Sequence, residues 1–91
     1  MNQPLPELLN SLESELLRLG YTDGTMTFYR NRWKKLLDFA EKRSEKYFSE
    51  ELGMAFAAEI LNVPIASGKL TQKETQDLRV VRMIGDFALH H

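Results

Sequence analysis

Residues 20–40 read GYTDGTMTFYRNRWKKLLDFA, and this stretch decides the fold class that the sequence predicts. Its apolar side chains recur every three or four positions, which is the period of one face of an α-helix. Thr22 or Asp23 can cap this helix with a side-chain oxygen, and Gly20 can end the helix before it. We therefore expect a helix over residues 23–43. Its inner face should carry Met26, Tyr29, Trp33, Leu36, Leu37 and Ala40.

The same period continues on both sides of this stretch, and no segment alternates apolar with polar residues as a strand would. Pro6 suits the first turn of a helix, and Ser49 is a good N-cap. Thr71-Gln72-Lys73-Glu74 has the pattern of a capping box, and a loop is expected over residues 62–68. Three further helices are therefore expected, over residues 6–19, 50–61 and 72–89.

Four amphipathic helices with short connections predict a compact all-α domain over residues 1–91. In the helix over residues 50–61, Phe56 and Ile60 are expected to be buried. In the last helix, one buried face is expected, with Phe87 at its edge. That face should hold Leu78, Val81, Ile84 (or Gly85) and Ala88.

The composition of the 91 residues excludes several classes of protein. The chain has no Cys, so neither a disulfide framework nor a thiolate metal site is possible. No window is apolar for long enough to cross a membrane, and the N-terminus lacks the pattern of a secretory signal. With 43% hydrophobic residues, the sequence predicts a folded cytoplasmic protein with no membrane partner.

Catalytic chemistry has little support in this sequence. The only imidazoles are His90 and His91 at the end of the chain, where a tag remnant or a frayed end explains them best. No glycine-rich phosphate loop is present. Glu50 and Glu51 are explained by the favourable position of acids in a first helical turn. We expect no catalytic residue, no metal site and no cofactor.

Charge is unevenly distributed along the chain, although the net charge is only −1. Residues 22–46 carry seven basic and four acidic side chains, a net charge of +3, whereas residues 1–21 and 47–70 each carry −2. This basic helix is either a solvated surface or a surface that contacts phosphate groups. A second polar face is expected on the last helix, where four side chains follow 4, 3 and 4 spacing: Thr75, Arg79, Arg82 and Asp86.

The order of motifs resembles the core-binding domain of the tyrosine recombinases, the family of the phage integrases. A Gly-Tyr-Thr sequence at residues 20–22 is followed by a hydrophobic run that ends in Phe39-Ala40. The segments Tyr47–Leu52 and Leu78–Phe87 are similar to the entry of the family's third helix and to its fourth helix. The resemblance covers about residues 5–89. The family positions in the second helix are occupied by Thr22, Thr25, Tyr29, Trp33, Leu36 and Phe39.

The resemblance implies a SAM-like orthogonal bundle of four helices that grips double-stranded DNA at a recombination site. In such proteins this domain is one half of a clamp, and a separate C-terminal domain holds the catalytic Arg, His and Tyr residues. None of that catalytic set is found here, so the chain is expected to be an excised domain, monomeric in isolation, of an integrase or recombinase.

The resemblance also implies the residues that contact DNA. On the second helix these are Thr25, Phe28, Asn31, Arg32 and Lys35. On the fourth helix they are Thr71, Lys73, Thr75, Gln76 and Arg79. Two residues depart from the family's pattern. Phe28 stands where a polar residue is common, and Asp77 adds an acid that is expected to weaken the contact with DNA.

A helical protein–protein interaction module is the alternative interpretation. It is suggested by the near-neutral net charge and by Phe28 and Phe39, which could form an apolar patch for a partner at the margin of the second helix. A contiguous exposed apolar patch would favour this alternative. A basic ridge that joins the second and fourth helices would favour DNA binding.

Overall fold

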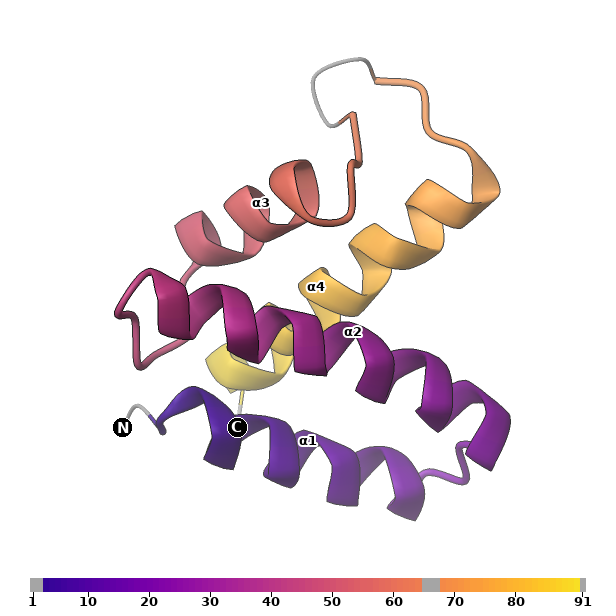
Figure 1. Ribbon diagram of the computed structural model, residues 1–91. Coiled ribbons are helices and arrows are strands. Elements are labelled where there is room, and N and C mark those ends of the chain that lie inside the picture. The colour runs from indigo at the N-terminus through magenta and orange to yellow at the C-terminus, as the bar shows by residue number, and fades with distance from the viewer. Residues whose placement is uncertain (1–2, 65–67, 91) are drawn as a thin grey trace. The chain divides into compact units, whose positions relative to one another are not determined.

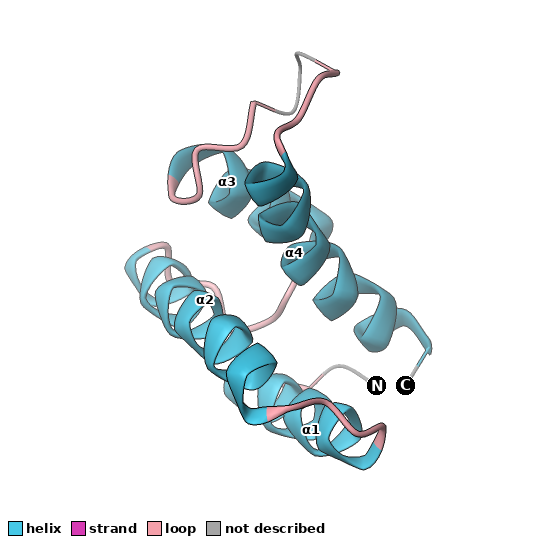
Figure 2. Cartoon of the chain, turned by 90° about the vertical axis from the view of Figure 1, so that its right-hand side faces the viewer, coloured by secondary structure: helices cyan, strands magenta, loops and turns pink. Residues whose placement is uncertain are grey.

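A computed structural model describes residues 3–64 and 68–90. The predicted loop therefore lies partly outside the described residues, as does His91. The described chain contains four α-helices and no β-strand, so the all-α prediction is confirmed (Figures 1 and 2). The helices are α1 (Leu5–Arg18), α2 (Asp23–Lys42), α3 (Glu50–Glu59) and α4 (Gln72–His90).

The chain divides into two compact units, Met1–Tyr47 and Phe48–His91, and each is described by itself. In the first unit, α1 and α2 run antiparallel to each other (Figure 1). Gly20 ends α1 with a φ of +93°, which a side chain would strain. The amide of Tyr21 donates to the carbonyl of Leu16 at 3.1 Å, and the amide of Gly20 donates to that of Leu17 at 3.1 Å. These two bonds define a Schellman motif.

The ends of α2 are also satisfied by local hydrogen bonds. Thr22 is the N-cap, and its Oγ1 accepts from the amide of Thr25 at 3.4 Å. At the C-terminal end Ser44 has a φ of +57°, and the amide of Glu45 donates to the carbonyl of Ala40 at 2.9 Å. This arrangement repeats the Schellman motif with serine at the position that usually holds glycine.

In the first unit, α2 buries most of the apolar stripe that the sequence predicts, and α1 buries five leucines. Tyr29 stacks on Trp33, with ring centroids 6.1 Å apart and an interplanar angle of 14°. Leu37 is half-buried at the margin of the inner face, whereas the other five predicted inner residues of α2 are buried. The buried residues of this unit are Leu5, Leu8, Leu9, Leu12, Leu16, Met26, Tyr29, Trp33, Leu36 and Ala40.

In the second unit, α3 and α4 begin at the predicted caps. The Oγ of Ser49 accepts from the amide of Leu52 at 3.0 Å. The Oγ1 of Thr71 accepts from the amide of Glu74 at 3.1 Å, and the Glu74 carboxylate accepts from the amide of Thr71 at 2.8 Å. The capping box is therefore confirmed.

Glycine permits a close contact between α3 and α4. A Cβ on Gly53 would lie 2.8 Å from Cγ1 of Val81 and 2.9 Å from Cζ of Phe48. The same ring reaches α4, because a Cβ on Gly85 would lie 3.4 Å from Cε2 of Phe48. The Phe48 ring thus packs against a bare stretch of backbone on each helix. The buried side chains of the unit include Leu52, Phe56, Ala57, Val63, Leu78, Val80, Val81 and Ile84.

Two predictions of burial in this unit are wrong. Ile60 is 40% exposed, because α3 ends at Glu59 and Ile60 is its C-cap rather than part of its inner face. Ala88 is exposed in the last turn of α4. With ten residues against nineteen, α3 is too short to pack along the whole of α4. The predicted burial of Phe56 is confirmed.

Candidate nucleic-acid interface

Five candidate DNA contacts lie on α2, within the first unit. Thr25, Phe28, Arg32 and Lys35 follow 3, 4 and 3 spacing and therefore share one side of the helix, and Asn31 lies one turn before Lys35. Thr25, Asn31 and Lys35 are exposed, whereas Phe28 and Arg32 are half-buried. The helix therefore presents its candidate side chains on one lateral strip beside the buried stripe.

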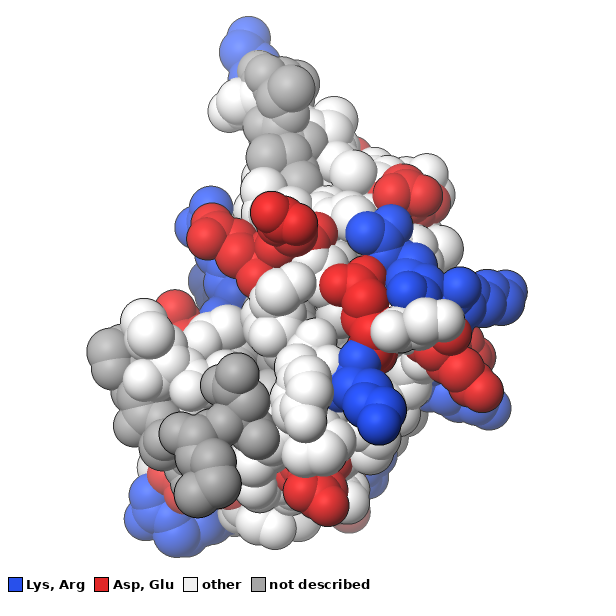
Figure 3. Space-filling view, turned by 90° about the vertical axis from the view of Figure 1, so that its left-hand side faces the viewer, with Lys and Arg blue, Asp and Glu red and all other residues white. Residues whose placement is uncertain are grey.

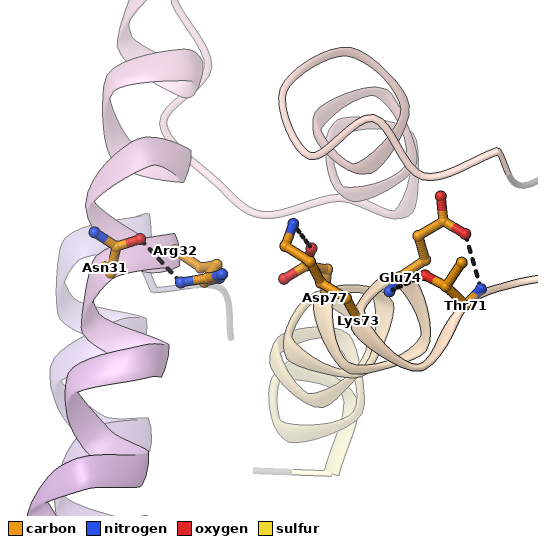
Figure 4. A network of polar contacts seen from close by, with 6 residues as sticks. All are labelled: Asn31, Arg32, Thr71, Lys73, Glu74 and Asp77. Atoms are coloured by element: carbon orange, nitrogen blue, oxygen red, sulfur yellow. Dashed lines mark hydrogen bonds and ion pairs between the residues drawn. The ribbon is translucent and has the colours of Figure 1, made fainter.

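Arg32 is held against Phe28 by an aromatic contact. Its Cζ lies 3.8 Å from the centroid of the Phe28 ring, within the range of a cation–π interaction. The Nη1 of Arg32 also donates to Oδ1 of Asn31 at 3.0 Å (Figure 4). Phe28 is itself supported edge-on by Tyr29, with centroids 5.9 Å apart. Phe28 is thus a platform that restricts the orientation of the guanidinium, which explains an apolar residue at this position.

The threonines at the start of α2 are partly engaged within the helix. Oγ1 of Thr22 donates to Oγ1 of Thr25 at 3.1 Å, and Oγ1 of Thr27 donates to the carbonyl of Asp23 at 2.9 Å. The hydroxyl of Thr25 accepts here and donates to no described residue, so its proton can bind an external acceptor. Thr25 is therefore the threonine best suited to contact a phosphate oxygen.

Ion pairs engage the basic side chains of Arg30 and Arg43 in the segment 22–46. Arg30 donates to Glu13 of α1, with Nε and Oε1 2.9 Å apart, and this hydrogen bond raises the pKa of Arg30. Arg43 forms a 2.6 Å pair with Glu45. Both acids offset part of the positive charge that the sequence places on this segment.

The remaining lysines of α2 are exposed and are close to an acid. Within residues 3–64 and 68–90, no ion pair involves Lys34, Lys35 or Lys42. Asp38 lies one turn from each of them and is also exposed. On the face drawn in Figure 3, basic and acidic groups are likewise interspersed. The surface of α2 is therefore a row of basic sites with an acid among them, not an unbroken basic ridge.

On α4, the first two candidates are engaged in local contacts. Thr71 is part of the capping box, and Nζ of Lys73 lies 3.4 Å from Oδ2 of Asp77 (Figure 4). The Lys73 side chain is 75% exposed, but that of Asp77 is only 1% exposed. The Asp77 carboxylate is therefore buried, and the expectation that it weakens a contact with DNA stays a prediction.

The other three candidates on α4 are available to solvent. Thr75, Gln76 and Arg79 are exposed, and their side chains bond to none of the residues that the structure describes. Arg82 and Asp86 continue the same exposed side, so the predicted polar face of α4 is confirmed. The candidates on α2 belong to the first unit and those on α4 to the second.

Phe28 and Phe39 do not form the apolar patch that the alternative interpretation requires. Both are half-buried, and Cζ of Arg43 lies 5.2 Å from the centroid of the Phe39 ring. Arg32 covers Phe28 in the same way. The large apolar side chains that are exposed lie elsewhere: Leu17, Leu19, Tyr47, Met54, Ile60 and Leu89.

Other kinds of site have no support among the residues that the structure describes. Among the described residues, no three His, Cys, Asp or Glu side chains are grouped closely enough to hold a metal ion. None of the helices, over the same residues, has the length and apolar character needed to cross a membrane. The chain matches no protein family, no curated protein and no solved structure.

The contact of Arg32 with Phe28 and the burial of Asp77 were not predicted from the sequence, although the spacing of the residues indicates both. Phe28 and Arg32 are four residues apart, a spacing that brings two side chains together on a helix. Asp77 is four residues before Val81 and seven before Ile84, which places it on the buried side of α4. The helical period therefore accounts for the burial of this polar side chain.

Proposed function

We propose that this chain is a DNA-binding module of the kind that grips the recombination site in tyrosine recombinases. The observation that supports this most strongly is the strip on α2, where Arg32 is stacked on Phe28 between the exposed side chains of Thr25 and Lys35. A flat, oriented guanidinium presents several donors in a fixed plane, which suits phosphate oxygens and the edges of bases.

The proposed roles follow from the chemistry of each side chain. Lys35 contacts the DNA backbone as a point charge, and Thr25 donates its hydroxyl proton to a phosphate oxygen. Arg32 offers a planar guanidinium, which suits a phosphate or a base edge, and the amide nitrogen of Asn31 can donate to a base or a phosphate. On α4, Thr75, Gln76 and Arg79 contribute a second group of contacts.

Binding by this module alone should be weak and sensitive to salt. Each neutralised phosphate releases counterions, so affinity falls as salt rises, and few cations are involved here. Non-specific complexes of this type have dissociation constants of about 10⁻⁴–10⁻⁶ M at physiological salt. We propose that the parent protein adds the remaining affinity and the strand-cleaving chemistry through a separate catalytic domain. The SAM-like arrangement of the helices remains a prediction.

Titration of a short, fluorescently labelled DNA duplex of mixed sequence tests the proposal. Anisotropy at low salt should rise with protein concentration, and addition of salt should reverse the rise. In NMR spectra recorded with the same duplex, the amide signals of Thr25, Arg32 and Lys35 should shift first. The double variant Arg32→Glu, Lys35→Glu should lose binding while its far-UV circular dichroism remains helical.

A matched control removes the same amount of charge elsewhere. Arg18 and Lys69 are exposed and lie outside the proposed strip, so Arg18→Glu with Lys69→Glu should retain most of the affinity. Equal losses in the two double variants would show that net charge alone governs binding, and the proposed strip would then be rejected. Absence of any anisotropy change at low salt would reject DNA binding altogether.

A further inference from the structure

A groove runs along the first unit between α1 and the C-terminal two-thirds of α2. It consists of two adjoining hollows, of about 670 Å³ and 210 Å³, which share Pro6 of α1 and Leu37 of α2. Leu5 and Ala40 line the larger hollow, and Leu9 lines the smaller one. The lining is mainly apolar in the larger hollow and mixed in the smaller one, so the groove between these two antiparallel helices is a place where a further helix can pack.

The two ends of the groove carry opposite charge. Beyond Leu37 toward the start of α2, the rim holds two bases and one acid: Arg30, Lys34 and Glu13. Toward the end of α2, the rim holds two acids and one base: Glu41, Glu45 and Lys46. Leu37, which is half-buried, lies between these two ends.

Lys34 and Glu41 are the rim charges best placed to bind a partner. They are seven residues apart, or about two helical turns, with Leu37 midway between them. Both are exposed, and neither forms an ion pair with any residue in the described ranges. Arg30 and Glu45, in contrast, are already paired with Glu13 and Arg43.

We infer that the groove binds a second copy of this chain in an antiparallel, two-fold symmetric dimer. The two-fold axis of this dimer passes beside Leu37. Lys34 and Glu41 lie at nearly equal distances along α2 on either side of that axis, so Lys34 of each copy faces Glu41 of the other. A parallel arrangement would instead place like charges together. Two helical hairpins joined in this way form a four-helix bundle, in which the groove of each hairpin is filled.

This inference does not depend on the proposed DNA contacts and differs from the monomer expected from sequence. Along α2 the rim of the groove carries first a positive side chain, then an apolar one and then a negative one. Two copies of this rim place opposite charges together only when their α2 helices run in opposite directions. A dimer of this kind uses a surface of α2 that includes Lys34, whereas the proposed DNA strip includes Lys35, about 100° further around the helix.

Sedimentation velocity of the full chain over a range of concentrations tests the inference. The wild-type chain should show a reversible monomer–dimer equilibrium. Lys34→Glu and Glu41→Lys should each raise the dimer dissociation constant about tenfold or more, since each reversal acts twice in a symmetric dimer. Lys34→Gln, which removes the attraction without adding repulsion, should give a smaller increase.

The decisive experiment mixes the two charge-reversed chains. Lys34→Glu and Glu41→Lys each self-associate poorly, but an equimolar mixture restores both opposite-charge contacts and should form a heterodimer. Trp33, the single tryptophan, lines the smaller hollow, so its fluorescence gives a second readout. The control Lys42→Glu makes the same charge change on α2 outside the groove and should leave the dissociation constant nearly unchanged.

Several results would overturn the inference. A wild-type chain that is monomeric at its highest soluble concentration contradicts it directly. So does a dimer that Lys34→Glu and Lys42→Glu weaken equally, because the groove would then have no special role. A mixture of the two reversed chains that fails to associate, although each variant is folded by circular dichroism, excludes the antiparallel arrangement.

Discussion

Replacement of Gly53 by alanine tests how closely α3 and α4 pack in the second unit. The new Cβ would lie 2.8 Å from Cγ1 of Val81 and 2.9 Å from Cζ of Phe48, distances that real Cβ contacts essentially never show. Val81 is 4% exposed, so its side chain has little room to turn away. Phe48 is half-buried and can move only by loosening its contact with Gly85. The side chains of Val81 and Phe48 must therefore shift, or the two helices must separate locally.

The expected size of the effect is a balance of two terms. Overpacking of a well-packed core costs about 1–3 kcal/mol. Alanine stabilises a helix interior relative to glycine by about 0.5–1 kcal/mol. The net result is a loss of about 0.5–2 kcal/mol in the free energy of unfolding, or several degrees in the midpoint of thermal unfolding.

Urea denaturation followed by far-UV circular dichroism measures this loss. Gly85→Ala is the matched control in the same unit, because its new Cβ would lie 3.4 Å from the Phe48 ring, close to an ordinary contact. Gly24→Ala in α2 is a second control, since nothing lies within 4 Å of its Cβ position. Both controls should be as stable as the wild type or up to about 1 kcal/mol more stable.

The reasoning depends on the difference between these variants. A Gly53→Ala chain that is as stable as Gly85→Ala would show that α3 and α4 accommodate the methyl group without cost. The close packing described here would then be refuted. A decrease confined to Gly53→Ala would support it.

Two further predictions concern single positions. Ser44→Gly should raise the free energy of unfolding by about 0.5–1 kcal/mol, because glycine adopts the left-handed backbone conformation of this position without steric strain. Urea denaturation followed by Trp33 fluorescence measures the gain. If Ser44→Gly is no more stable than the wild type, the left-handed conformation assigned to Ser44 is contradicted. Asp77→Ala should lower the free energy of unfolding by about 1–3 kcal/mol, because it removes a buried, paired carboxylate. The control Asp86→Ala changes an exposed residue and should alter the free energy of unfolding by less than about 0.5 kcal/mol. Equal effects of the two aspartate variants in calorimetry would argue that Asp77 is not buried.

The local sequence was sufficient to predict the helices and most of their ends. Thr22, Ser49 and the pair Thr71–Glu74 form the expected caps, and Gly20 ends α1 as expected. Each of these features depends on residues within a few positions of one another, so a single sequence contains the information. The apolar periodicity likewise predicted most of the buried stripe of α2.

Tertiary structure decided the features that depend on residues far apart or on the length of a packing partner. Glu13 pairs with Arg30 across 17 positions, and this pair removes one of the basic sites that the sequence suggested. Ile60 fits the apolar pattern but is exposed because α3 ends at Glu59, and Ala88 fits it but is exposed in the last turn of α4. A hydrophobic pattern specifies which side of a helix turns inward, but not how far its partner extends.

In the candidate interface too, some features could be predicted from the sequence and others depend on the tertiary structure. From the sequence alone, residues 22–46 could be identified as basic, and α4 could be assigned a polar face. The structure decided that Arg32 stacks on Phe28, that Asp77 is buried, and that Lys34 and Glu41 border an apolar groove. Charge is counted along the chain, but the energy of a charge depends on its neighbours in space, and only folding determines those neighbours.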